Sequence, residues 1–210
     1  MISLLKRYTR WLHTRWPAGH VEKLPVVAAD GTTSVPGLYV VGDITGIPLL
    51  KFSSDSGALA VQTIAGDPSF RKRDRDARRD NAPVLDLVII GAGVSGVAAA
   101  IEAGKQGLGF ELVEANEPLA TIVNFPKGKP IFTYPTGMTP AGDLQFTERS
   151  GVKEGLVEEL RGYMDAAGLE PGAFEVVQRI REVVVPAVIS QRHVSTLCPP
   201  ARWTWISAFR

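Results

Sequence analysis

Three glycines and one glutamate have the types and spacing of a phosphate-binding turn. The run Gly91-Ala92-Gly93-Val94-Ser95-Gly96 has the pattern G-x-G-x-x-G, and Glu114 follows at the end of the next apolar segment. Gly91 permits a tight turn, Gly93 lets a phosphate approach the backbone, and Gly96 allows a helix to pack closely on a sheet. The helix amides and dipole attract a pyrophosphate, and an acidic group at Glu114 accepts hydrogen bonds from ribose hydroxyls. The pattern predicts an adenine-dinucleotide site.

The elements around these residues are those that the motif needs. Leu85–Ile90 is an apolar run apart from Asp86, typical of a parallel strand buried on both faces. Val94–Gln106 is rich in alanine and predicts a helix, and Phe110–Glu114 predicts the next strand. We therefore expect a β-α-β unit. The alternative is a purely structural glycine turn with Glu114 as a surface carboxylate.

This unit belongs to a block that we place at residues 84–180. Its loop from Asn116 to about Thr139 is rich in proline, glycine and aromatic residues, and a helix is expected over Lys153–Ala167. Residues 181–210 form a tail that we assign to no element, apart from a candidate strand at Val183–Ile189. The predicted fold class is α/β, a Rossmann-like domain with a parallel central sheet, flanking helices and a small β-hairpin lobe.

A first block covers residues 1–67. The turn signals Asp30-Gly31 and Pro36-Gly37 predict a hairpin between strands at Leu24–Ala29 and Leu38–Gly42. A helix over Ser53–Ile64 should follow, with a cap from one of three polar residues: Ser53, Ser54 or Asp55.

Residues 2–16 show helical spacing of apolar residues, with lysine and arginine on the other side. Such a helix packs on its own domain or lies on a membrane surface, and we favour packing. Residues 68–83 are dense in charge and nearly free of apolar residues, which predicts an exposed linker. Interleaved aspartates, and Phe70 as the single aromatic residue, argue against a nucleic-acid patch there.

Composition excludes several classes of protein. The chain has 210 residues, 45% of them hydrophobic and 21% charged, and a net charge of +1, so no global field favours nucleic acid or anionic membranes. A single cysteine, Cys198, excludes an internal disulfide and a CxxC pair, which points to a reducing, cytoplasmic setting. We expect no transmembrane segment, no secretory signal and no metal site. No residue is a convincing catalytic acid, base or nucleophile.

The run Leu87–Glu114 resembles the amino-terminal FAD motif of the two-dinucleotide flavoprotein reductases, a group that includes the thioredoxin reductases. Spacing alone does not separate FAD from NAD, and this resemblance implies FAD. The site residues that it covers are Gly91, Gly93, Val94, Ser95, Gly96 and Glu114.

A second resemblance lies in the first block, where Val35–Asp43 is similar to the carboxy-terminal FAD motif of the same enzymes. It implies that Gly42 and Asp43 contact FAD, with the aspartate on the ribityl chain. It also implies that the next helix points its amino end at the flavin ring, where Ser54, Asp55 and Gly57 stand at the matching place. The alternative is a simple strand and turn.

The run from Asn124 to Thr139 resembles relatives of these reductases that lack the redox CxxC, such as bacillithiol-disulfide-reductase-like proteins. Three aromatic residues there, Phe125, Phe132 and Tyr134, would either line the flavin or simply pack.

The order of the two FAD motifs is reversed relative to that family, and no second glycine-rich fingerprint for a nicotinamide domain is present. Either the halves close on one another as a permuted FAD domain, or each belongs to another protomer of a homodimer or to a longer protein. The resemblance implies an FAD-dependent oxidoreductase that takes electrons from NAD(P)H and passes them to a small-molecule or protein acceptor. The alternative is a non-catalytic dinucleotide-binding module or a truncated gene fragment.

Overall fold

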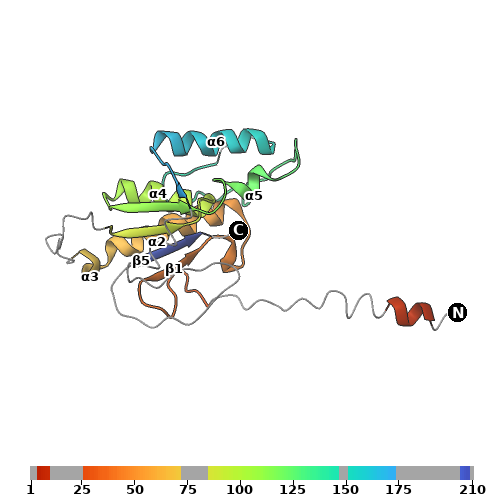
Figure 1. Cartoon of the computed structure of the whole chain (residues 1–210), viewed down its shortest axis with the longest axis horizontal. Coiled ribbons are helices and arrows are strands. Elements are labelled where there is room, and N and C mark those ends of the chain that lie inside the picture. The colour runs from red at the N-terminus through yellow and green to blue at the C-terminus, as the bar shows by residue number, and fades with distance from the viewer. Residues whose placement is uncertain (1–3, 10–25, 72–84, 147–150, 174–203, 209–210) are drawn as a thin grey trace.

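The computed structural model describes residues 4–9, 26–71, 85–146, 151–173 and 204–208. Within them a five-stranded parallel sheet has the order β1-β5-β2-β3-β4 (Figure 1). Its strands are β1 (Leu38–Val41), β2 (Leu87–Ile90), β3 (Phe110–Glu114), β4 (Gly172–Ala173) and β5 (Thr204–Ala208).

The predicted β-α-β unit is confirmed. β2 is followed by α4 (Val94–Lys105) and then by β3, which pairs in parallel with β2. β2 begins two residues later than expected, at Leu87, and the carboxylate of the preceding Asp86 accepts the Gly109 amide at 2.8 Å. The fold class is therefore α/β and Rossmann-like, as the sequence predicts.

Two long helices cover one face of the sheet. Leu87 and Ile89 alternate on that face and pack in one hydrophobic cluster with Ala60, Val61 and Ile64 of α2 (Leu50–Gly66) and with the alanines of α4. A second cluster joins the other side of α4 to α5 (Ala120–Val123) and α6 (Lys153–Ala166). Helix α4 thus lies between α2 and α6 (Figure 1).

Helices α2 and α4 touch backbone to backbone. A Cβ added to Gly57 of α2 would overlap the carbonyl oxygen of Ser95 on α4, so this position requires glycine. A polar contact follows two turns later, where Gln62 Nε2 donates to Oε1 of the buried Glu102 at 3.2 Å. The close approach joins the first block of the sequence to the second.

The carboxy-terminal tail, which the sequence analysis assigned to no element, contributes the strand β5. Residues 204–208 pair with β1 on one side and with β2 on the other, both in parallel. A five-residue run is too short to show a clear apolar periodicity, so the sequence pattern did not indicate this strand. The candidate strand Val183–Ile189 lies outside the described residues.

The hairpin of the first block is reduced to a single antiparallel bridge between Thr32 and Tyr39, and residues 26–29 do not form the expected strand. The Asp30 carboxylate accepts both the amide and the hydroxyl of Thr32, at 3.0 and 2.7 Å. This local side-chain bond replaces a ladder bond, as aspartate commonly does in turns. Through the Thr32 hydroxyl it also lowers the pKa of Asp30.

Three further expectations, on the first block and on the linker after it, need correction. Helix α2 begins at Leu50 rather than Ser53, and no side chain caps it. The linker opens with α3 (Pro68–Arg71), which buries Phe70 in the core; residues 72–83 lie outside the described part. Residues 4–9 are helical as expected, but Leu4, Leu5 and Tyr8 are exposed rather than packed on the domain. Within the described ranges, no helix is long and apolar enough to cross a membrane.

Candidate functional site

The glycine turn stands between β2 and α4. Gly91 has a φ of 99°, a conformation that favours glycine, and its amide donates to Val113 O on β3 at 2.7 Å. Gly93 is the N-cap of α4, and no side chain caps that end of the helix. The first bond inside α4 runs from the Val97 amide to Gly93 O at 2.9 Å, so the preceding amides have no acceptor within the helix.

The space in front of this turn is open. A Cβ added to Gly93 would meet no heavy atom within 4 Å. Behind the turn, Val94 and Ser95 are buried, and so is Gly96. Unpaired helix amides that border open space at a positive helix end are a suitable cradle for a pyrophosphate. The residues present therefore fit the group that the motif predicts.

Glu114, at the end of β3, lies against the same turn. Its Oε2 accepts the Ala92 amide at 2.7 Å, and its Oε1 accepts the Asn116 amide at 3.0 Å. Sequence reasoning placed Glu114 at the ribose but did not foresee these two backbone bonds. Each carboxylate oxygen has a further acceptor position, so the group can hold the turn and still receive a ribose hydroxyl.

Gly42 and Asp43 follow β1, in the turn that contains the short helix η1 (Asp43–Thr45). The Gly42 amide donates to Ser56 Oγ at 3.0 Å, and Ser53 Oγ donates to Asp43 Oδ1 at 2.6 Å. Both serines come from the first two turns of α2. The Asp43 carboxylate is thus held by a hydroxyl and remains partly exposed.

The two motifs end at one edge of the sheet. Val41 of β1 pairs with Ala208 of β5, and Ile90 of β2 pairs with the neighbouring Ser207, so both strands end at nearly the same level. One strand separates them, which corresponds to about 10 Å. From β2 the chain proceeds to β3 and β4 on one side, whereas β5 and β1 lie on the other. Ligands of open α/β sheets bind where strand order diverges in this way.

The structure places Ser54, Asp55 and Gly57 elsewhere than expected. They lie beyond the first residues of α2 rather than at its amino end. Ser54 is buried and its Oγ donates to Leu144 O at 2.9 Å, while Asp55 Oδ1 accepts the Ala141 amide at 2.7 Å. Gly57 lies against the backbone of Ser95. All three therefore make contacts within the protein.

Sequence reasoning missed Lys51, which is only 5% exposed. Its Nζ donates to three carbonyl oxygens of one loop: Pro135 at 2.9 Å, Thr136 at 3.2 Å and Met138 at 2.8 Å. The one local signal was a lysine between Leu50 and Phe52, in an otherwise apolar run.

The three aromatic residues of the run from Asn124 to Thr139 differ in their surroundings. Phe125 packs against the second hydrophobic cluster, and Lys129 Nζ lies 3.5 Å from its ring centroid. Phe132 and Tyr134 are exposed and stack on each other, with ring centroids 5.8 Å apart. Phe125 is therefore a packing residue, whereas the other two present flat surfaces to solvent.

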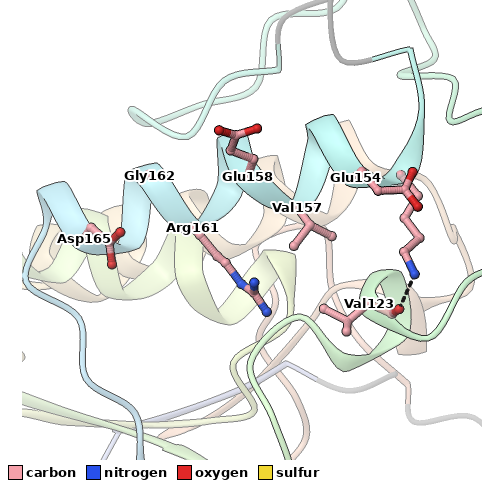
Figure 2. Close-up of a pocket in the computed structure, with 8 residues that line it drawn as sticks. Val123, Glu154, Val157, Glu158, Arg161, Gly162 and Asp165 are labelled. Carbon is pink, nitrogen blue, oxygen red and sulfur yellow. Dashed lines mark hydrogen bonds between the residues drawn. The ribbon is translucent and has the colours of Figure 1, made fainter. Parts of the chain in front are cut away.

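A separate groove of about 590 Å³ lies along α6, beside the end of α5 (Figure 2). Lys153 Nζ donates across it to Val123 O at 2.6 Å, and the Glu154 carboxylate accepts the Gly128 amide, which holds the pKa of Glu154 below its usual value. Arg161 extends from α6 toward the inner side of the groove (Figure 2). None of the predicted site residues lines it.

No metal-ligand cluster of histidine, cysteine, aspartate or glutamate occurs in the described ranges. The three histidines and Cys198 lie outside them. A further pKa shift is found away from the turns, where the salt bridge to Asp143 raises the pKa of Lys105.

No protein-family model matches the chain, and no curated protein matches it. Among solved structures, the chain is similar to the bacillithiol disulfide reductase Bdr (YpdA) from Staphylococcus aureus, with 24% identity and a TM-score of 0.37. The match covers 43% of this chain and only 28% of the reductase.

Proposed function

We propose that this chain binds FAD across the carboxyl edge of its parallel sheet. The observation that supports this proposal is the arrangement of Gly91–Gly96 and Gly42-Asp43 at one edge, one strand apart. A dinucleotide is long enough to reach both turns, whereas a mononucleotide would need only the first.

The direction of the ligand follows from the sheet order. The pyrophosphate would lie at the first amides of α4, over the open space at Gly93. Glu114 at the end of β3 would receive the adenosine ribose, which places the adenosine on the β3 side. The other half then extends toward β5 and β1, where Asp43 can accept hydrogen bonds from sugar hydroxyls.

We further propose an oxidoreductase of the pyridine-nucleotide-dependent flavoprotein type, with NAD(P)H as electron donor and a small molecule or protein as acceptor. When bound, FAD supplies the redox chemistry, and the residues of this chain bind and orient it. A protein that binds FAD but is not reduced by NADH or NADPH would instead be a non-catalytic dinucleotide-binding module.

The test is titration of the purified protein with FAD, NAD⁺ and ADP, followed by calorimetry and by flavin absorption after gel filtration. We expect retained flavin and tighter binding of FAD than of ADP. A Gly162→Val variant serves as control for Gly93→Val. Gly162 lies on α6 with open space around it and is far along the chain from both turns. A folded protein that binds neither FAD nor ADP would contradict the proposal.

A further inference from the structure

Lys51 is a buried cation whose donors are all used by one loop. An ammonium has three N–H donors, and Nζ of Lys51 makes three bonds to the carbonyls of Pro135, Thr136 and Met138. These acceptors lie 84 to 87 residues further along the chain. The loop is folded around the charge, in the way that backbone carbonyls surround a bound cation.

The charge of Lys51 is not neutralised by an ion pair. Among the described residues, the Lys51 ammonium bonds to these three carbonyl oxygens and to no carboxylate. Burying an ammonium is costly unless all its donors are satisfied. Since the three carbonyls are what satisfies it, the loop conformation and the buried charge depend on each other.

Two neighbours of Lys51 on the same face of α2 hold the rest of this loop. Ser54 and Asp55 stand three and four residues further on, the spacing of one helix face. Ser54 Oγ donates to Leu144 O, and Asp55 accepts the Ala141 amide. The first turns of α2 therefore bind residues 135–144, which we name the α2-bound loop.

The α2-bound loop lies at the edge of the sheet that the ligand is proposed to occupy. Helix α2 follows β1 through the Gly42-Asp43 turn, so its first residues are at the carboxyl end of β1. If the adenosine lies on the β3 side, the second half of the dinucleotide extends to this end of the sheet. The loop that Lys51 fixes would then flank that half.

We propose that Lys51 is a positioning residue that folds the α2-bound loop into a wall of the dinucleotide site, on the side of the flavin and ribityl groups. The inference rests on the proposed function and deepens it. Lys51 acts through the loop carbonyls of Pro135, Thr136 and Met138. It follows that the residue should matter for the half of FAD that ADP lacks.

The experiment compares FAD and ADP affinities of Lys51→Met, Lys51→Arg and a matched control, Lys153→Met. Lys153 also begins a helix and also donates to loop carbonyls, those of Val123 and Phe125, but in the loop after α5. We expect Lys51→Met to weaken FAD binding about tenfold and to leave ADP binding unchanged. Lys51→Arg, which keeps the charge, should recover part of the loss, and Lys153→Met should keep the ratio of the two affinities.

Hydrogen exchange gives a second readout that needs no variant. In the wild-type protein, FAD should slow amide exchange in residues 135–144, whereas ADP should not, and this result decides the matter if Lys51→Met does not fold. A wild-type loop that responds equally to FAD and ADP would overturn the inference, as would a folded Lys51→Met protein with the wild-type affinity ratio. A wild-type protein that binds neither nucleotide would contradict the proposed function itself.

Discussion

Glu114 holds the glycine turn, and in the proposed site it would also accept a ribose hydroxyl. Its carboxylate accepts the amides of Ala92 and Asn116, so it fixes the end of β3 against the glycine turn. We predict that Glu114→Ala weakens ADP binding by about 1–3 kcal/mol, because it removes the ribose acceptor and leaves amides of the turn without a partner.

Calorimetric titration with ADP measures this effect. Glu117→Ala is the matched control, since Glu117 is an exposed glutamate in the same connection. Unchanged ADP affinity in Glu114→Ala, with the fold intact, would show that the carboxylate does not meet the ribose.

A substitution at Gly93 can distinguish a role of this residue in ligand binding from a role in folding. Its φ of −74° suits any residue, and an added Cβ would meet nothing within 4 Å. Gly93→Val should therefore leave the melting temperature nearly unchanged and abolish measurable FAD and ADP binding, because the new side chain would fill the space of the pyrophosphate. Thermal unfolding monitored beside the titration checks both parts, and retained binding would argue against the pyrophosphate position.

At the residue scale, the sequence predicted the positions of those residues that depend only on neighbours along the chain. The positions of Gly91, Gly93 and Glu114 follow from one strand, one turn and one helix, so their spacing is informative. The role of Lys51 depends on carbonyls more than 80 residues away, and no local pattern reports such a contact. Helix α2 starts at Leu50, three residues before the predicted start, so Ser54 and Asp55 lie within the helix rather than at its first residues.

Among the elements, the packing of α2 on α4 joins the first block of the sequence to the second. Gly57→Ala should lower the free energy of unfolding by about 1–3 kcal/mol, because its Cβ would overlap the carbonyl of Ser95 and force the helices apart. Chemical denaturation provides the measurement.

Gly66→Ala is the matched control for Gly57→Ala. Gly66 is the last residue of the same helix and an added Cβ there would meet nothing within 4 Å. Alanine favours helix over glycine by up to about 1 kcal/mol, so this variant should be as stable as the wild type or more so. Equal stability of the two variants would mean that α2 and α4 can separate slightly without cost.

Elements with a strong apolar pattern were predicted well, and short or mixed ones were not. β3 has the predicted bounds, and α4 and α6 each end one residue early. β5 has five residues in a tail with no periodicity, and its strand character comes from the partners β1 and β2 on both sides. Within the expected strand Leu24–Ala29, the described residues 26–29 form no strand, and the side chain of Asp30 bonds locally to Thr32.

At the scale of the whole molecule, one sheet joins the two blocks of the sequence. The first block supplies β1 and α2, the second supplies β2, α4 and β3, and β5 lies between β1 and β2. Both turns therefore end strands of one continuous sheet. The sequence left this open, because it gave no sign that residues 204–208 pair with both halves.

Because both turns lie at one edge of this sheet, a substitution of Asp43 tests whether the two turns bind one ligand. We predict that Asp43→Ala weakens FAD binding by about 1–3 kcal/mol and leaves ADP binding as in the wild type, since ADP lacks the ribityl chain. Ser53 Oγ holds Asp43 Oδ1 at 2.6 Å, so Ser53→Ala should produce a smaller loss in the same direction. Titration of each variant with both ligands measures the two affinities.

Asp165→Ala, an exposed aspartate on α6, serves as the control and should change neither affinity. The outcomes separate three arrangements of the molecule. Loss of FAD affinity alone means that one ligand spans the edge from α4 across β5 to β1. Equal loss of both affinities would mean that Asp43 acts through folding of the turn after β1. No loss of either would mean that the two motifs share a sheet but not a ligand, because a carboxylate in contact with the ribityl hydroxyls cannot be removed without cost.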